Sequence, residues 1–247
     1  MKSAIDDLPE MRVSGWGVLT KTLSLFARNA GALLLIAAII ALPIEALKNY
    51  FLVSSYEGPF STFARDSLVS LLFLCVLTPV VTYYLMAKLR NEKASILQSY
   101  LWGIRKWLPM ITYSFLQGVI VSAGFILLIV PGILMSIRLL MLPIIVSVEN
   151  TSIMNPLEVS RNMSVGRFWR MLGYAVLVMG VVLVVALIGL TGLDYIIPEY
   201  WILMTVYDVL YDWLYLLFTV LLIVIYLKLK TEAKDAAQAE KDNREVY

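Results

Sequence analysis

Four ionisable side chains interrupt long apolar stretches of this sequence: Glu45, Arg138, Asp208 and Asp212. An ionisable group inside a lipid bilayer is costly, so each is a candidate functional residue. Asp208 and Asp212 are four residues apart, which places both carboxylates on one face of a helix. Arg138 is the basic residue expected at the same depth. The spacing therefore predicts a buried polar cluster of Arg138, Asp208 and Asp212, together with Glu45, as a site for a lipid headgroup, an ion or a proton.

Two other interpretations of these four residues stay open. They could form an interhelical ion pair that fixes helix packing, or lie near enough to the membrane surface for their side chains to extend into water. The aromatic residues around the two aspartates, Tyr207, Tyr211, Trp213 and Tyr215, are typical of a membrane interface. This setting favours a packing role.

Composition excludes most familiar membrane-enzyme chemistry. The sequence has no histidine and one cysteine, Cys75, so Ser-His-Asp and Cys-His catalysis and histidine-held metals are ruled out. Paired carboxylates also occur in glycosidases, but no nucleophile motif, phosphate-binding glycine loop or metal-ligand set accompanies them here. We therefore expect no enzymatic activity, no cofactor and no metal.

The elements that position these residues are membrane helices. Hydrophobic residues make up 60% of the 247 residues and charged residues only 15%, against about 25% charged in a soluble domain. A membrane-spanning helix needs about 20 apolar residues. Six segments meet this requirement: residues 30–53, 67–87, 107–130, 132–148, 171–193 and 201–227. The expected fold class is an all-α membrane protein with six transmembrane helices.

Short connections suggest that these spans pair as three hairpins in one transmembrane domain, residues 1–230, followed by a charged cytoplasmic tail, residues 231–247. The third and fourth spans are separated by little more than Pro131 and Gly132, a dipeptide typical of a tight turn. The competing interpretation is a re-entrant pair that never crosses fully. We expect the tail to extend the last helix briefly and then to be disordered.

Basic residues predict the orientation of the chain. All of the 20 Lys and Arg residues except Lys48, Arg65 and Arg138 lie on the side of the N-terminus if the six spans are real. Because positive loops stay in the cytoplasm, both termini are expected there, in a bacterial inner (cytoplasmic) membrane. Acidic residues stand where a cleavable signal would be basic, so the first span is expected to stay as an anchor.

A basic-aromatic junction precedes each odd-numbered span, following a segment expected to be an amphipathic interfacial helix on the cytoplasmic side. Surface helices of this kind attract anionic lipid; the simpler interpretation is that they only lead the chain into the membrane. In the third segment, Asn155 and Pro156 are suited to starting a helix. The candidate lipid-headgroup residues are Arg28, Arg105, Lys106, Trp107, Arg167, Trp169 and Arg170.

The stretch from Val130 to Trp169 resembles a known family. It contains the turn sequence Val130-Pro131-Gly132-Ile133, then Arg138 and Pro143, then a segment in which Ser160 and Trp169 fit the family pattern. These features resemble the YciC-like inner-membrane proteins and the membrane domain of some bacterial glycerophosphodiester phosphodiesterases. The resemblance implies a six-span fold in the inner membrane and an envelope or lipid-related role. The catalytic phosphodiesterase domain is absent from this sequence.

Three functions follow from these observations. The first is a non-enzymatic inner-membrane protein that binds lipid, expected to be anionic phospholipid, or a membrane-protein partner, in envelope maintenance or lipid movement. The second is a small secondary transporter or proton-coupled carrier that uses the intramembrane cluster. The third is an assembly subunit of a larger complex, homo-oligomeric or with another membrane protein. Nothing in the sequence points to nucleic acid.

Overall fold

The computed structural model describes residues 8–53, 59–93, 95–151, 153–196 and 201–245. Over these residues the chain is helical and contains no strand. The elements in chain order are α1 (Gly17–Val53), α2 (Pro59–Leu72), the 3-10 turn η1 (Leu74–Val76), α3 (Leu77–Leu89), α4 (Ile96–Leu127), α5 (Ile129–Arg138), α6 (Leu142–Val148), α7 (Pro156–Ser164), α8 (Phe168–Ile196) and α9 (Trp201–Glu245).

Several of these helices are able to cross a membrane. Within the described part of the chain, five segments are long and apolar enough, and α2 with α3 makes a sixth if this bent pair is one broken span. The five segments are Gly17–Tyr50, Ile96–Leu127, Ile129–Val148, Phe168–Thr191 and Trp201–Lys241. The prediction of an all-helical chain with several helices long and apolar enough to cross a membrane is confirmed.

Helices α1 and α9 form the most extensive helix pair and the centre of the apolar core. Leu33 and Ile36 of α1 are fully buried, as are Leu221 and Val224 of α9, in one continuous cluster. Between membrane helices, such close packing is stabilised by van der Waals contact and interhelical hydrogen bonds rather than by removal of side chains from water. The indole nitrogen of Trp213 also donates to the carbonyl of Ala30 over 3.1 Å. This pair therefore sets where the charged groups of both helices meet.

Prolines interrupt two of the predicted spans. The second span is bent by 41° between α2 and α3, with η1 at the bend. Pro79 lacks the N–H that would bond to the carbonyl of Cys75, which explains the bend. In the fourth span, Pro143 likewise leaves the carbonyl of Leu139 without its helical donor.

The span predicted for residues 132–148 is not one continuous helix, because the structure divides it into α5 and α6 with a break at residues 139–141. The stretch Ile129–Val148 as a whole remains long and apolar enough to cross a membrane. The Gln117 amide donates to the free Leu139 carbonyl over 3.3 Å, and the Leu142 N–H donates to the same oxygen over 3.0 Å. These two hydrogen bonds satisfy the Leu139 carbonyl, so the break leaves no unpaired backbone acceptor at this position.

The turn between α4 and α5 lies three residues earlier than predicted, at the extended residue Leu128. Pro131 falls in the first turn of α5, where the missing N–H costs nothing. Gly132 is needed for close packing, because a Cβ there would lie 2.4 Å from the Phe125 ring. A Cβ on Gly124 would likewise lie 3.0 Å from the Cα of Gly132. The two glycines let the helices of this hairpin approach closely.

The interfacial segments follow the prediction only in part. The amphipathic segments before the first and third spans continue into α1 and α4 without a break. The segment before the fifth span is a separate helix, α7. The Asn155 side chain accepts from the N–H of Leu157 over 3.2 Å, and Pro156 occupies the start, as predicted. The tail is not disordered through Glu245, because α9 continues to that residue; residues 246–247 lie outside the described part.

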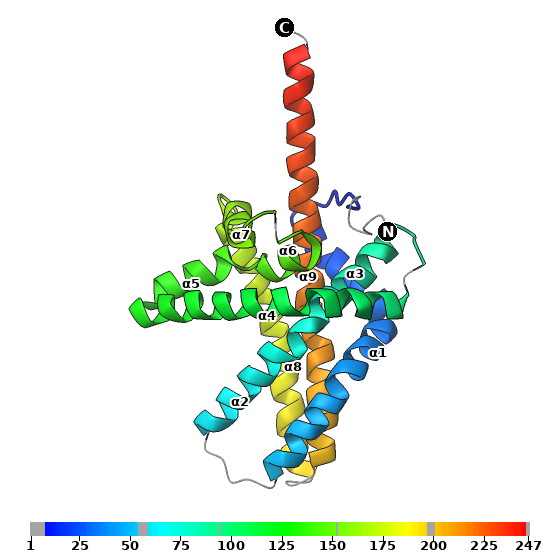
Figure 1. Cartoon of the computed structure of the whole chain (residues 1–247), viewed down its shortest axis with the longest axis vertical. Coiled ribbons are helices and arrows are strands. Elements are labelled where there is room, and N and C mark those ends of the chain that lie inside the picture. Colours follow the sequence, from blue (N-terminus) through cyan, green and yellow to red (C-terminus); the bar gives the residue numbers. More distant parts are fainter. Residues whose placement is uncertain (1–7, 54–58, 94, 152, 197–200, 246–247) are drawn as a thin grey trace.

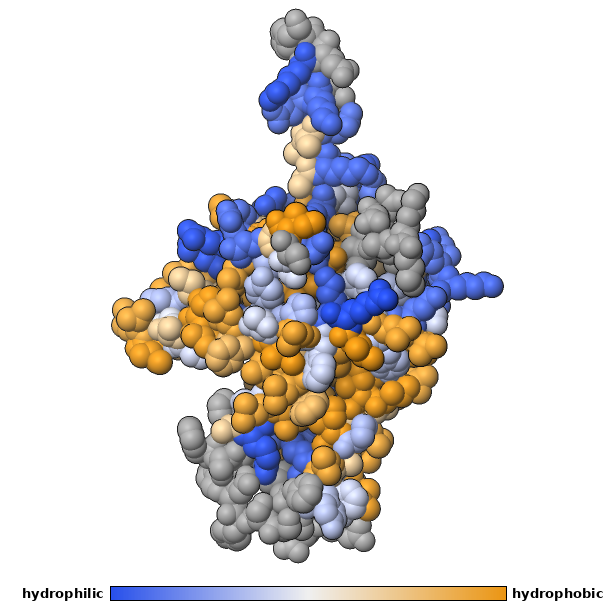
Figure 2. Space-filling view, viewed as in Figure 1, coloured by the Kyte–Doolittle hydropathy of each residue, from blue (hydrophilic) through white to orange (hydrophobic). Residues whose placement is uncertain are grey.

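Figure 1 shows two directions of helices. Helices α1, α8 and α9 run along the long axis of the molecule, and α9 extends far beyond the others, whereas α4 and α5 lie across this axis and project to one side. Figure 2 shows hydrophobic residues in a band over the middle of this face and at the projecting end of the α4–α5 hairpin, with hydrophilic residues gathered around the base of the α9 extension.

Candidate functional site

A charged cluster joins α1 to α9, and its cation is Lys48. The Lys48 ammonium contacts the carboxylate of Glu45, lies 3.1 Å from that of Asp208 and 3.9 Å from that of Asp66. The side chains of Glu45 and Lys48 are 3% and 11% exposed. Glu45 and Lys48 are three residues apart, on one helix face. Glu45 and Asp208 do lie close together, but the cation between them is Lys48 and not the expected Arg138.

Hydrogen bonds extend this cluster. The Asn49 amide donates over 2.9 Å to Oδ2 of Asp208, the same oxygen that Lys48 contacts, and over 3.3 Å to the hydroxyl of Thr205. Asn49 and Thr205 are both buried. A carboxylate held by an ammonium and an amide is well satisfied, so Asp208 ties the two helices together at this end of the bundle.

Asp212, one turn further along α9, has a different setting. One of its carboxylate oxygens is buried and has no hydrogen-bond partner among the described residues. The side chain lines a cavity of about 500 Å³ that also contains Asp66, Ser70 and Ser114. In the described part of the chain no three His, Cys, Asp or Glu residues are placed to hold a metal ion. Asp212 is therefore available to a proton or a solute.

Arg138 is not in this cluster, and the prediction that it pairs with Asp208 and Asp212 is corrected. It is the last residue of α5, and its carbonyl accepts a hydrogen bond from the hydroxyl of Ser160 on α7 over 2.9 Å. The reason is the break after α5. In one continuous helix over residues 132–148, Arg138 would lie inside a span, whereas here it lies at the end of a helix, beside α7.

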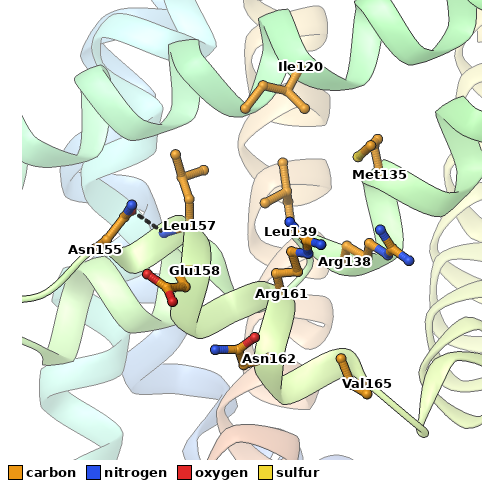
Figure 3. Close-up of a pocket in the computed structure, with 10 residues that line it drawn as sticks. All are labelled: Ile120, Met135, Arg138, Leu139, Asn155, Leu157, Glu158, Arg161, Asn162 and Val165. Carbon is orange, nitrogen blue, oxygen red and sulfur yellow. Dashed lines mark hydrogen bonds between the residues drawn. The ribbon is translucent and has the colours of Figure 1, made fainter.

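Arg138 instead lines a pocket of about 650 Å³ between α4, α5 and α7. Figure 3 shows Arg138 and Arg161 on one side of the pocket, Glu158 and Asn155 on the other, and Ile120 facing them from α4. The remaining lining residues are Met135, Leu139, Leu157, Asn162 and Val165. The pocket is thus a largely apolar space with two guanidinium groups at one side, which the sequence did not reveal.

The two guanidiniums of this arginine pocket share it with one carboxylate, that of Glu158. Arg138 is half-buried and Arg161 is exposed, and within the described residues neither makes an ion pair with a carboxylate. Guanidinium groups bind phosphate oxygens in a fork of parallel hydrogen bonds. Two unpaired guanidiniums beside apolar walls suit an anion that carries an apolar chain.

The other basic-aromatic junctions are partly used for packing. Arg28 on α1 and Arg105 on α4 are exposed. The Lys106 ammonium donates to the backbone carbonyl of Glu149 over 2.6 Å and lies over the Trp102 ring, 5.4 Å from its centre. The indole of Trp107 donates to a backbone carbonyl of α2. Arg28 and Arg105 therefore remain open to lipid, whereas Lys106 and Trp107 hold helices together.

The third junction faces α9 and the start of α1. Arg167 lies 3.3 Å from the carboxylate of Glu232. Trp169 is 79% exposed, and with Arg170 and the exposed Trp16 it lines a shallow pocket of about 300 Å³. Two exposed indoles beside an arginine are typical of the headgroup layer. This pocket is a second candidate lipid contact.

Glu149, which the sequence did not single out, is the centre of a further polar network. Its carboxylate lies 2.5 Å from the Lys230 ammonium and accepts a hydrogen bond from the Tyr226 hydroxyl over 2.7 Å. Burial acts to raise the pKa of Glu149, but the bonds from Lys230 and Tyr226 outweigh it and hold the pKa below its ordinary value. The network fixes the end of α6 against α9.

No family model, no curated protein and no solved structure matches this chain. The resemblance around Val130–Trp169 therefore remains an expectation, and the case for function depends on the geometry of the sites.

Proposed function

We propose that this chain is a non-enzymatic, multi-pass protein of a bacterial inner membrane that binds an anionic phospholipid from the cytoplasmic leaflet. Both termini are placed in the cytoplasm on the distribution of Lys and Arg. The arginine pocket carries the proposal, because two guanidiniums, neither in an ion pair with any described residue, stand beside an apolar space open to one side of the molecule. The corresponding cellular role is envelope maintenance or lipid movement.

The chemistry of the pocket matches a phospholipid better than a small soluble anion. The phosphate diester supplies oxygens for Arg138 and Arg161, and the acyl chains supply apolar contact for Ile120 and Leu157. A small anion would leave the apolar walls in contact with water. Ligand pockets of about 300–1,000 Å³ commonly combine apolar walls with a few polar groups that orient the ligand.

Native mass spectrometry of the protein in a mild detergent tests this function. With phosphatidylglycerol added, we expect the wild type to retain one or more lipids and the Arg138→Gln/Arg161→Gln variant to lose at least about ten-fold in affinity, the equivalent of about 1.4 kcal/mol. The matched control is Lys241→Gln/Arg244→Gln, which removes the same charge from the exposed end of α9. Equal retention by both variants would overturn the assignment of the pocket.

The basic-aromatic junctions give a second test of the same function. Neutralising the four basic residues at the second and third junctions should weaken binding to vesicles or nanodiscs rich in anionic lipid more than to zwitterionic ones. Unchanged lipid retention would limit lipid binding to the arginine pocket. The four residues are Arg105, Lys106, Arg167 and Arg170.

The cavity beside Asp212 supports one alternative, a proton-coupled carrier. Its buried carboxylate oxygen has no hydrogen-bond partner in the described part of the chain and borders a space of about 500 Å³. Under this alternative, Asp212→Asn abolishes accumulation of a solute by proteoliposomes in a pH gradient. Transport that survives the substitution would remove Asp212 from the mechanism, and the absence of transport by the wild type would exclude the carrier.

A further inference from the structure

The α4–α5 hairpin is too short on one side to cross a membrane. Helix α5 has 10 residues, Ile129–Arg138, and is therefore about 15 Å long at about 1.5 Å per residue. The hydrocarbon core of a bilayer is about 30 Å thick. If Arg138 lies at the cytoplasmic surface with Arg161, the tip of the hairpin reaches half of this thickness at most.

The chain beyond α5 does not supply the missing length. After the break at residues 139–141, α6 turns back into the body of the protein, and its residues Leu142 and Ile144–Val148 are buried. It packs against α3, α4 and α9. The stretch Ile129–Val148 is therefore apolar enough for a span in total, but only its first half belongs to the projecting hairpin.

The projecting part of the hairpin carries an apolar surface that no described element covers. Residues 125–130 are six consecutive apolar residues at the tip, with Ile126 at 86% and Leu128 at 69% exposed. No charged residue occurs from Trp107 to Ile137. A tip of this kind in water would be an aggregation hazard, so it requires a nonpolar environment.

The direction of the hairpin matches partial insertion. In Figure 1, α4 and α5 lie across the direction of α8 and α9 and project to one side. Helices that cross one bilayer are tilted by about 20° on average, with a range of about 0–40°. Two helices that lie crosswise to α8 and α9 run along the membrane rather than through it. The exposed tip in Figure 2 is continuous with the apolar band of the bundle.

We propose that the α4–α5 hairpin is embedded in the cytoplasmic leaflet alone, with lipid acyl chains around its tip, and that the chain crosses the membrane four times rather than six. The crossings are α1, the bent pair α2–α3, α8 and α9. An even number keeps both termini on one side, as the Lys and Arg distribution requires. Arg138, the last residue of α5, marks the headgroup level at the base of the hairpin.

A hairpin in one leaflet adds volume to that leaflet only, so the protein acts as a lateral wedge in the membrane. This inference does not rest on lipid binding by the arginine pocket. The hairpin could lie in the leaflet while the pocket binds nothing, and the two experiments report separately.

Cysteine accessibility in oriented membranes tests the depth of the tip. In a Cys75→Ser background, single cysteines replace Leu127 at the tip, Trp201 at the start of α9 and Lys241 near its end. We expect a membrane-impermeant maleimide to label Trp201→Cys only from outside and Lys241→Cys only from inside. Leu127→Cys should resist labelling from both sides until detergent is added.

Labelling of Leu127→Cys from the same side as Trp201→Cys would show a full crossing and overturn the inference. Labelling from the cytoplasmic side without detergent would place the tip in water and also overturn it. A bimane probe at Ile126→Cys gives a second measurement: lipids brominated along the acyl chain should quench it strongly. Because both side chains are largely exposed, neither substitution removes packing that the fold requires.

Discussion

Replacing Lys48 by methionine should destabilise the protein far more than the same replacement at an exposed lysine. Lys48 is the cation shared by Glu45 and Asp208, and its side chain is 11% exposed. Methionine keeps most of the apolar stem but leaves both carboxylates without their ammonium. Removing one partner of a buried ion pair typically costs about 3–5 kcal/mol, and we expect a loss of this size in the free energy of unfolding.

Lys234 supplies the matched control. Its ammonium lies 2.8 Å from the carboxylate of Glu10, but the two side chains are 71% and 47% exposed. Exposed ion pairs contribute little to stability because water and salt screen them. Lys234→Met should therefore leave stability almost unchanged. The comparison changes burial while residue type, partner type and substitution stay the same.

The assay is unfolding by SDS in mixed micelles, followed by circular dichroism. A double variant, Lys48→Met/Glu45→Leu, sharpens the test because it removes one orphaned carboxylate together with the lysine. We expect it to be more stable than Lys48→Met alone, since burying an unpaired carboxylate costs more than losing the pair. Equal stability of Lys48→Met and Lys234→Met would contradict a buried ion pair. So would a double variant whose loss equals the sum of the losses from Lys48→Met and Glu45→Leu measured singly.

Two further predictions concern the cytoplasmic network and the hairpin. Lys230 helps to hold the pKa of Glu149 below its ordinary value against the effect of burial. Glu149 therefore contributes stability above the usual glutamate pKa of about 4.3, and this contribution is lost as pH falls through the lower folded-state pKa. In thermal unfolding, Glu149→Gln should be less stable than wild type at pH 7 and equally stable in acid; a difference that stays constant with pH would contradict this. Gly132→Ala forces its Cβ against the Phe125 ring and should lower the free energy of unfolding by about 1–3 kcal/mol. The control is Gly118→Ala, whose Cβ would meet nothing within 4 Å; it should leave the free energy of unfolding unchanged or raise it. Similar losses in both variants would exclude the packing explanation.

The sequence pattern predicts the membrane helices and part of the charged cluster well. Apolar length identifies the spans, and Asn155 with Pro156 marks the start of α7, because both signals depend on local chemistry alone. Helical spacing also places Asp208 on a defined face. These features depend on residues a few positions apart, so one sequence contains enough information to find them.

The choice of partners across helices is harder to predict. Depth along the chain suggests Arg138 as the cation for Asp208, but depth says nothing about which helices are neighbours. The i,i+3 spacing of Glu45 and Lys48 is a local signal that identifies the cation actually used. Likewise Pro143 signals a break in the fourth span, but a sequence pattern cannot tell a kink from a reversal that returns α6 to the core.

Helix α9 has a mechanical consequence beyond its role in packing. Its 45 residues contain neither proline nor glycine, so it lacks the usual sites of sharp bending. It holds the ion cluster at Asp208 and, 27 positions later, meets the N-terminal segment through an ion pair of Asp235 with Arg12. At about 1.5 Å per residue, these points are about 40 Å apart on one stiff rod. A pivot of about 5° at the membrane end would move the other end by roughly 3.5 Å over this length, which is enough to separate the groups of an ion pair. An intact α9 would therefore pass a change of charge at one surface to the other as a displacement of its far end.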